Sequence, residues 1–416
     1  MSNSPRILLY AHNTRGLGHA SRLVGLAWGI YQQMPAASVL CCTGAMHDLA
    51  AILPPNTDYI KMPSFDAVEK NGKLVLFPAR LNLERRELIA VRRSLLSAAA
   101  STFRPDILLA DYTPLGKDEE LEEAVTILRG GENRLILLGL RDILNDAERA
   151  NHYLRHDVYP ALRRYFDGAF VYSDPGWVDF QQLYEVPPDL VHKFVHVGFV
   201  VNDRELSRTK EEVRQELLGE SGTGPLVILG SGGGKDATDV LSVAVGAWRR
   251  LQPALPHAVR LVIIPGPYIR PAQWQWLLDT TRDLPTVKVL HHVPYLLEVI
   301  RAADLYIGAC GYNAFVEAMT ANTPTIFIPH AQVDSDEQRI RAHMLQPLGG
   351  WQVVQPEPQG EVELAEAIIT TLSLPPLHYQ RRRAIRLDGA WQVARRLQRW
   401  YEGDPLWKIT EPCAAA

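Results

Sequence analysis

Cysteine is scarce in this chain, and long hydrophobic runs are missing. Only four of the 416 residues are cysteines, and the spacing of Cys41, Cys42, Cys310 and Cys413 matches no zinc-binding pattern. Reduced cysteines are typical of the cytoplasm, which is the location we expect. No stretch approaches the ~18 apolar residues that a membrane-spanning helix needs, and the apolar run near the N-terminus is too short for a signal sequence. Peripheral contact with a membrane surface remains open.

Excess charge of either sign is also lacking. The formal net charge is -4, with 47% hydrophobic and 22% charged residues, which is ordinary for a globular protein. This balance gives no reason to expect nucleic acid as a partner. Arginines cluster at 381–383 and 395–396, and we interpret them as solvated helix faces rather than as a membrane-binding patch. Internal repeats and low-complexity tracts are absent, and the sequence leaves the oligomeric state open.

In the first half of the chain, short apolar runs alternate with helix-compatible segments. Helices are predicted at 20–33 and 83–103. The predicted strands are Ile7–Tyr10, Ser38–Cys42, Tyr59–Met62, Ile107–Ala110, Leu135–Leu138 and Ala169–Tyr172. Continuous apolar strands separated by helices indicate a parallel sheet that is covered on both faces.

The same pattern restarts after residue 203, where a polar helical segment at 209–218 leads into a new series of strands. These are Leu226–Leu229, Arg260–Ile264, Thr286–Leu290, Leu305–Ile307 and Thr325–Ile328. The repetition predicts an α/β fold of two doubly wound, Rossmann-like domains that face an interdomain cleft, the default ligand site. We expect domains at 1–202 and 203–380, and a segment at 381–416 whose long helix, at 381–402, packs back on them.

The first motif is RGLGHASR at residues 15–22, directly after the first predicted strand. Its glycines let a ligand approach the backbone closely, and the following helix offers free N–H groups and a positive dipole end. His19 can accept a proton at neutral pH. The dinucleotide-binding fingerprint is not satisfied, because the third glycine is missing at its proper spacing. A tight strand–helix turn with an exposed histidine is the alternative interpretation.

The second motif is GSGGGKDA at residues 230–237, after the first strand of the second half. Each glycine costs about 0.5–1 kcal/mol relative to alanine in regular structure, and backbone amides gathered around a diphosphate would offset that cost. The motif is not a Walker loop, because Lys235 lacks the correct upstream glycine and a following Ser or Thr. A flexible connector is the alternative.

The third motif spans residues 303–342. A strand ends at a glycine-bearing turn, a helix starts near Asn313, and Glu317 lies one turn further with acceptors suited to the two hydroxyls of a ribose. After the next strand, Asp336, Glu337 and Gln338 head another helix and could bind sugar hydroxyls. Residues 334–336 are formally a D-x-D metal signature, and their place at a helix start argues against a metal site here. A purely structural role for the whole motif is the alternative.

At these residues the chain resembles GT-B glycosyltransferases of the MurG-like group, with a C-terminal domain of the family 28 type. It resembles more closely a bacterial family of predicted glycosyltransferases that share a GLGH-x-x-R start and a GYN-x-x-x-E core. The segments at 104–106, 111–116 and 139–144 are similar as well, so the resemblance covers roughly residues 6–375. Two departures stand out: Ala314 replaces a frequent Thr or Ser, and residues 338–342 lack the Gln-x-x-Asn-Ala ending of MurG.

The resemblance implies a role for each matching residue. An acceptor-side loop would contain Gly16, Gly18 and His19. The donor diphosphate would be held by Ser231, Gly232, Gly233, Gly311, Tyr312 and Asn313. Glu317 would bind the donor ribose, and Glu337 with Gln338 would contact the transferred sugar. The base of the nucleotide would meet main-chain groups near His292 and Val293; His291 and His292 are poor candidates for metal ligands, because adjacent side chains on a strand diverge.

The predicted reaction is attack by an acceptor hydroxyl on the anomeric carbon of a nucleotide sugar, for which we expect a UDP-linked donor. Neither a metal nor a cofactor is expected, since backbone amides and helix N-termini would meet the charge of the leaving diphosphate. His19 is the predicted general base and Asp111 its orienting partner, with Asp142 as the fallback. Arg141 is available to an anionic acceptor. Asp111 and Asp142 could equally be helix caps.

Three other functions stay open from the sequence. In a nucleotide-sugar hydrolase of the same fold, His19 would activate water instead of an acceptor. An epimerase of that fold is a weaker alternative, and a non-catalytic nucleotide-sugar sensor belongs to a different class altogether. The acceptor, the donor sugar and the stereochemical outcome are not determined by the sequence.

Overall fold

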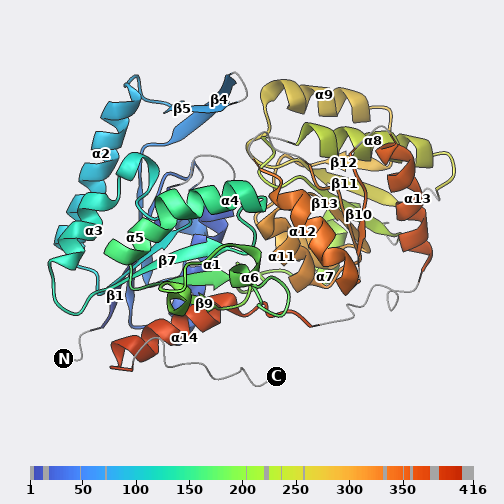
Figure 1. Ribbon diagram of the computed structural model, residues 1–416. Coiled ribbons are helices and arrows are strands. Elements are labelled where there is room, and N and C mark those ends of the chain that lie inside the picture. Colours follow the sequence, from blue (N-terminus) through green and yellow to red (C-terminus); the bar gives the residue numbers. More distant parts are fainter. Residues whose placement is uncertain are drawn as a thin grey trace. The chain divides into compact units, whose positions relative to one another are not determined.

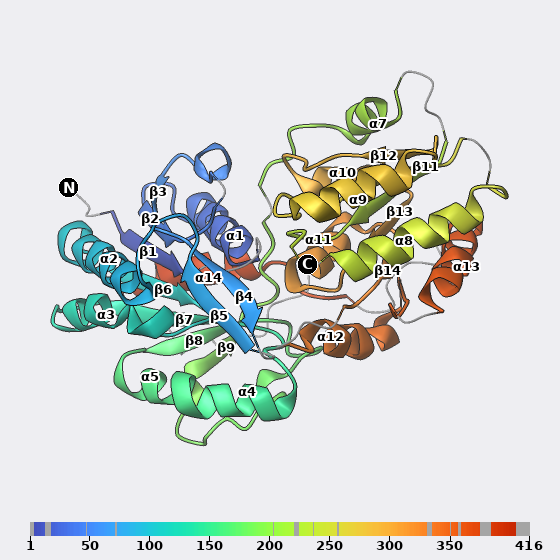
Figure 2. The same ribbon diagram turned by 90° about the horizontal axis from the view of Figure 1, so that it is seen from above.

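The computed structural model describes residues 4–12, 18–46, 48–70, 73–202, 204–219, 224–235, 237–255, 258–330, 335–349, 351–356, 359–374 and 384–404. The chain folds as two compact units. One contains the residues up to Arg204 together with those from Ile385 onward, and the other runs from Glu205 to Ala384. Figures 1 and 2 label the elements of each unit.

A seven-stranded sheet in the order β3-β2-β1-β6-β7-β8-β9 forms the centre of the first unit, and all its neighbouring strands are parallel. Its strands are β1 (Arg6–Ala11), β2 (Ser38–Thr43), β3 (Thr57–Lys61), β6 (Ile107–Asp111), β7 (Leu135–Arg141), β8 (Gly168–Tyr172) and β9 (Phe194–His196). The helices are α1 (Gly18–Gln33), α2 (Arg85–Ala98), α3 (Glu122–Arg129), α4 (Ala147–Tyr153), α5 (Tyr159–Arg164), α6 (Phe180–Leu183) and α14 (Gly389–Tyr401).

Both faces of this sheet are covered, which explains why its strands are apolar without alternation. Leu8 and Tyr10 of β1 belong to one continuous core with residues of helices α2 to α5. Ile7 and Leu9, which point to the opposite face, are equally buried, and α1 packs against β1. The predicted strands of the first half are therefore confirmed, with β9 added at the edge.

Helix α14 lies against α1 of the same unit (Figure 2). The two helices approach closely at Gly29, where an added Cβ would lie 2.6 Å from the carbonyl oxygen of Ala390. The helix predicted at 381–402 is shorter in the structure: residues 384–388 are not helical, and 381–383 lie outside the described residues. The C-terminal segment thus packs on the first unit, which it rejoins after the second.

The structure contains an antiparallel hairpin between β3 and α2 that was not predicted from the sequence. It consists of β4 (Phe65–Lys70) and β5 (Lys73–Pro78), which pair only with each other. The hairpin extends away from the seven-stranded sheet (Figure 1). Its two ends are held together where Ala79 N donates to the carbonyl oxygen of Ser64 at 2.9 Å.

The second unit contains a six-stranded parallel sheet in the order β12-β11-β10-β13-β14-β15. Its strands are β10 (Leu226–Gly230), β11 (Arg260–Ile264), β12 (Val287–Val289), β13 (Leu305–Gly308), β14 (Thr325–Phe327) and β15 (Trp351–Val353). Its helices are α7 (Lys210–Leu218), α8 (Thr238–Leu251), α9 (Pro271–Thr281), α10 (Leu296–Ala302), α11 (Tyr312–Ala321), α12 (Glu337–Leu345) and α13 (Gly360–Ser373).

The strand order of the second unit is that of a Rossmann fold, 3-2-1-4-5-6, and the first unit repeats it with one strand more. The predicted fold of two doubly wound α/β domains is confirmed. In each sheet the order reverses beside the first strand, between β1 and β6 and between β10 and β13. Ligands of such folds bind outside the carboxyl ends of the strands at this reversal. Within the described residues, no helix is both long and apolar enough to span a membrane.

Candidate functional site

The reversal point of the first unit brings together a small cluster of charged and aromatic side chains. His12 follows β1, His19 lies in the first turn of α1, and Asp111 is the last residue of β6. Ala11 and Asp111 are register partners in adjacent parallel strands, so the ends of both strands meet at the same edge. His19 was predicted as the base and Asp111 as its partner, and these two residues are in contact.

The contact is close and nearly buried. His19 Nδ1 lies 2.5 Å from Asp111 Oδ2, and the exposed fractions of the two side chains are 17% and 4%. Arg22 completes the cluster, because its Nε donates to Asp111 Oδ1 at 3.1 Å and its Nη2 to Oδ2 at 2.8 Å. His19 and Arg22 are three residues apart on α1, which places them on one face of the helix. The H-x-x-R spacing therefore directs both side chains to one carboxylate.

The charges in this cluster leave the imidazole neutral. Burial favours the protonated carboxyl of Asp111, but Arg22 and His19 outweigh burial and hold the pKa of Asp111 below its usual range. Burial lowers the pKa of His19; Asp111 opposes this shift, while Arg22 and Arg141 add to it. At neutral pH the pair is therefore a carboxylate beside an uncharged imidazole.

The hydrogen-bonding pattern also fixes which nitrogen can accept a proton. Arg22 Nη2 lies 2.8 Å from His19 Nδ1, but Nδ1 cannot accept from Arg22 and donate to Asp111 at the same time. We assign the proton to Nδ1 because the carboxylate is the nearer group, at 2.5 Å. Nε2 of His19 then carries a free lone pair, as a general base requires.

Two aromatic neighbours of His19, namely His12 and Tyr112, were not identified from the sequence. The His12 ring lies 4.6 Å from the His19 ring, and burial, with nearby cations, lowers the pKa of His12 so that it too is neutral. Tyr112 stacks on Tyr153 at 5.5 Å and carries the guanidinium of Arg141 over its ring at 4.7 Å. His12 and Tyr112 each lie two residues after a predicted strand, and this position was a signal that could have identified them.

The remaining predicted residues of the first domain are placed differently. Asp142 is buried after β7; burial raises the pKa of the Tyr184 hydroxyl, and the nearby carboxylate of Asp142 raises it further. Asp142 is therefore an electrostatic neighbour of Tyr184, and its role as a fallback base stays a prediction. Gly18 begins α1, and Gly16 lies outside the described residues.

In the second unit, the glycine motif follows β10 and packs on a second loop. Gly234 has φ +91°, and a Cβ there would lie 2.5 Å from the carbonyl oxygen of Pro265. Gly232 also has positive φ, +71°, but no atom lies within 4 Å of an added Cβ. Ser231 Oγ donates to Pro265 O at 2.6 Å. Packing thus explains Gly234, whereas the backbone at Gly232 and Gly233 remains the better candidate for a phosphate contact.

Helix α11 begins beside this loop, after β13. Gly311 is its N-cap and has no side chain with which to cap the helix. Tyr306 reaches the same edge, since an added Cβ at Gly230 or Gly308 would lie 2.9 or 2.5 Å from its hydroxyl. Within the described residues, the buried Tyr306 hydroxyl has no hydrogen-bond partner. This residue was not predicted.

Glu317 lies one turn into α11 and is partly buried. Burial raises the pKa of its carboxyl to about 7. The carboxylate also contributes to the raised pKa of Tyr306, after the larger effect of burial, so the two groups are close. A carboxyl group that is half-protonated at neutral pH is sensitive to any ligand that donates hydrogen bonds to it.

Helix α12 packs on the loop before α11. Gln338 Oε1 accepts from Cys310 N at 3.2 Å, and Arg341 Nη1 donates to Cys310 O at 2.7 Å. Arg341 also lies 3.2 Å from Glu337 Oε1. Glu337 and Gln338, which were predicted to contact the transferred sugar, are both buried; Gln338 bonds to the loop directly, and Glu337 contacts Arg341, which also bonds to it. Arg341, fully buried, is the residue of this group that was not predicted.

His292 and Val293 follow β12 at the same edge of the second sheet. His291 and His292 are exposed, with ring centroids 5.7 Å apart. Within the part of the chain that the structure describes, no group of three or more His, Cys, Asp or Glu side chains is arranged to hold a metal ion. A contact between the nucleotide base and the main chain of residues 292–293 stays a prediction.

Comparison with known proteins gives the class. Residues 228–392 match the glycosyltransferase family 28 C-terminal domain. Over 180 residues the chain is 27% identical to the UDP-N-acetylglucosamine--N-acetylmuramyl-(pentapeptide) pyrophosphoryl-undecaprenol N-acetylglucosamine transferase of Paramagnetospirillum magneticum, covering 42% of this chain and 46% of the relative. Over 264 residues it is 25% identical to the NDP-glycosyltransferase YjiC of Bacillus subtilis, covering 59% of each. The chain thus spans about half the length of these relatives.

Solved structures support the same fold at low sequence identity. MurG of Acinetobacter baumannii superimposes with a TM-score of 0.57 at 15% identity, covering 95% of this chain and 99% of that one. A UDP-N-acetylglucosamine 2-epimerase superimposes with a TM-score of 0.64 at 10% identity over the full length of both chains. At these identities the structures establish the fold alone.

The fold and the matching domain define a GT-B protein. Residues 228–392, most of which lie in the second unit, match the glycosyltransferase family 28 C-terminal domain, and the chain is similar in sequence to MurG- and YjiC-type glycosyltransferases and in fold to MurG. The resemblance predicted from the sequence is confirmed at this level.

Proposed function

We propose that this chain transfers a sugar from a nucleoside diphosphate sugar, expected to be UDP-linked, to an acceptor hydroxyl, without a metal ion and with His19 as general base. The observation that carries the proposal is the 2.5 Å contact between His19 and Asp111 at the reversal point of the first sheet. This contact directs Nδ1 to a carboxylate and leaves Nε2 free to take a proton. The pattern is that of an activated base oriented by a third group.

Donor binding is assigned to the second unit. The start of α11, the backbone at Gly232 and Gly233, and Glu317 lie near the carboxyl ends of β10 and β13. Backbone N–H groups and a helix dipole can stabilise a diphosphate leaving group, and a carboxylate can accept hydrogen bonds from two ribose hydroxyls. The names of the two relatives, a UDP-N-acetylglucosamine transferase and an NDP-glycosyltransferase, support a nucleotide-sugar donor.

During transfer, the acceptor hydroxyl attacks the anomeric carbon, and its proton passes to His19 Nε2. The bond between the anomeric carbon and the diphosphate oxygen breaks, and the nucleoside diphosphate leaves. Asp111 stabilises the imidazolium that forms, and Arg22 keeps Asp111 ionised throughout. Metal independence follows from the use of backbone amides in place of a cation at the diphosphate.

The test is a transfer assay with UDP-sugars and fractions of a native-host extract, followed by product mass, with EDTA or with magnesium. We expect a product whose mass equals acceptor plus sugar, formed equally well under both conditions. A strict requirement for a divalent ion would contradict metal independence. Release of UDP at the same rate with and without extract would instead identify a hydrolase, and a change of the sugar without its release would identify an epimerase. Tight donor binding without any turnover would identify a sensor.

A further inference from the structure

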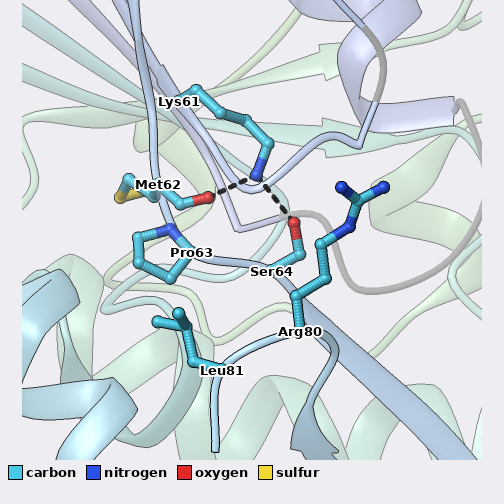
Figure 3. Close-up of a pocket in the computed structure, with 6 residues that line it drawn as sticks. All are labelled: Lys61, Met62, Pro63, Ser64, Arg80 and Leu81. Carbon is cyan, nitrogen blue, oxygen red and sulfur yellow. Dashed lines mark hydrogen bonds between the residues drawn. The ribbon is translucent and has the colours of Figure 1, made fainter.

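A cavity of about 220 Å³ opens in the first unit between the end of β3 and the base of the β4–β5 hairpin. Figure 3 shows the six residues that line it: Lys61, Met62, Pro63, Ser64, Arg80 and Leu81. We call this cavity the Lys61–Arg80 pocket. None of its residues takes part in the reaction proposed above.

The hairpin is what brings two cations to this pocket. Lys61 is the last residue of β3, and Arg80 follows the hairpin, whose ends are joined by the hydrogen bond from Ala79 N to Ser64 O at 2.9 Å. Lys61 Nζ donates to Met62 O at 2.7 Å and to Ser64 Oγ at 2.8 Å. Figure 3 shows the side chains of Lys61 and Arg80 beside Ser64, reaching it from different directions.

The positive charge of the pocket is not balanced. Among the described residues, neither Lys61 nor Arg80 forms an ion pair with a carboxylate. Partial burial lowers the pKa of Lys61, and the guanidinium groups of Arg92 and Arg80 lower it further. Two cations and the hydroxyl of Ser64 therefore face one cavity without a counter-charge. A phosphate or carboxylate group would accept hydrogen bonds from the two cations. The Ser64 hydroxyl donates its proton to Gly44 O at 2.8 Å and accepts from Lys61, so it helps to orient the ammonium group.

A buried arginine connects this pocket to the neighbourhood of the proposed base. Arg92 Nη1 donates to Pro63 O, in the pocket wall, at 2.6 Å, and Nη2 donates to His12 O at 3.1 Å. Arg92 is itself held by a buried ion pair with Glu120. The pocket wall and the backbone of His12, whose ring lies 4.6 Å from that of His19, are thus spanned by one guanidinium.

We propose that the Lys61–Arg80 pocket binds a phosphate or carboxylate group of the acceptor, so that the acceptor is an acidic molecule. This inference rests on the proposed function, because it assigns the acceptor of that reaction. An anionic group anchored here would hold the acceptor within reach of the segment that carries His19.

The binding test uses inorganic phosphate and glycerol phosphate as probes, titrated into the full chain with UDP at saturation to block the donor site. We expect Arg80→Ala and Lys61→Ala each to weaken probe binding by about fivefold or more, as expected when one charged hydrogen-bond donor is lost, and Arg80→Lys to retain part of it. Arg86→Ala is the matched control, since Arg86 is an exposed cation paired with Glu84 outside the pocket. Absence of probe binding to the wild-type chain, or probe binding that is unchanged in Arg80→Ala and Lys61→Ala, would overturn the proposal.

The transfer assay gives a second readout. Inorganic phosphate should inhibit transfer to the extract acceptor in the wild-type chain but not in Arg80→Ala, whose UDP affinity should be unchanged. If the wild-type chain did not bind UDP, the proposed function would be refuted. Binding of inorganic phosphate to the Lys61–Arg80 pocket would still be measurable and would be judged separately. A third outcome concerns membranes. The chain could bind phosphatidylcholine vesicles only when they contain phosphatidylglycerol, lose this binding in Arg80→Ala, and not bind glycerol phosphate. That result would assign the pocket to a lipid headgroup and overturn the acceptor proposal.

Discussion

The residues that set the chemistry of the first unit are His19, Asp111 and Arg22. A carboxylate beside an imidazole normally raises the pKa of that imidazole. If the pKa rose above the working pH, the histidine would already be protonated and could not act as a base. Here Arg22 neutralises much of the Asp111 charge, and burial disfavours the imidazolium. Asp111 can therefore orient His19 while the imidazole stays uncharged before the reaction.

Replacement of His19 tests this arrangement. His19→Ala should leave donor affinity nearly intact and reduce turnover by roughly 10²–10⁴, the usual range for the loss of a general base. Asp111→Asn should cause a smaller loss, since it disturbs only the orientation and charge of the imidazole. Because the pKa of His19 is lowered, the wild-type rate should fall only below about pH 6.5, the ordinary value for histidine. Loss of UDP binding in His19→Ala, with an unchanged rate at saturating donor, would make His19 a phosphate contact.

Glu317 gives a pH-dependent prediction for the second unit. Its pKa is raised to about 7, so an ionised carboxylate that binds ribose is available only above that pH. UDP affinity should rise about tenfold between about pH 6 and about pH 8 and then level off. Glu317→Gln should bind UDP more weakly and lack this rise. Titration of UDP itself affects both proteins equally, so the ratio of the two affinities reports Glu317 alone. Parallel pH profiles in the two proteins would exclude Glu317 from the nucleotide site.

The same shift has a consequence for stability. Because the folded-state pKa of Glu317 lies above the unfolded value, the protein should lose stability as pH rises from about 4.5 to about 7. Glu317→Gln removes that loss, so the variant should gain stability relative to wild type towards neutral pH in urea unfolding. This control shows whether the carboxyl titrates near pH 7 in the absence of any ligand.

At the scale of elements, the glycine loop after β10 combines two requirements that the sequence alone could not separate. Gly234 sits against Pro265, whereas Gly232 faces open space. Both have positive φ, +91° and +71°. Three consecutive glycines indicated a special backbone, but only the packing of a second loop, distant in sequence, decides which glycine serves the fold and which could serve a ligand.

Alanine at these two positions should have different effects. Gly234→Ala combines left-handed strain with a backbone clash and should lower the free energy of unfolding by about 1–3 kcal/mol. Gly232→Ala carries the strain alone, about 1–2 kcal/mol, but its methyl group would project into the space assigned to the diphosphate. We therefore expect the larger loss of UDP affinity in Gly232→Ala and the larger loss of stability in Gly234→Ala, measured by calorimetry and urea unfolding. The reverse order would place the diphosphate elsewhere.

The elements themselves were predictable where burial on both faces made the strands continuously apolar, as in β1, β6 and β10. The hairpin β4–β5 was missed because it lies outside the seven-stranded sheet. The short strands β9 and β15 were also missed, and each lies at the edge of its sheet. The pairing of His19 with Asp111 was predictable from strand ends and helix spacing. Neither Arg341 nor the Lys61–Arg80 pocket was, since both depend on loops that meet only in the folded chain.

At the scale of the whole molecule, the division into units is not simply sequential. The chain leaves the first unit at Arg204 and returns to it at Ile385, where α14 covers α1. Sequence periodicity finds the repeat of two sheets, because each starts with a strand followed by glycines. It cannot find which unit the last helix covers, because a helix with one apolar face packs equally well on any apolar surface of matching shape.

This division predicts how nucleotide binding should be distributed along the full chain. Hydrogen–deuterium exchange with and without UDP should show new protection after β10 and β13 and along α11, because the amides proposed to hold the diphosphate lie there. Exchange in β1, α1, β6 and α14 should not change. His19→Ala should reproduce the wild-type pattern, since it removes the proposed base and leaves the nucleotide contacts, whereas Gly232→Ala should weaken the protection. Protection that appears instead at the start of α1 would assign the diphosphate to the first unit and exchange the roles proposed for the two units.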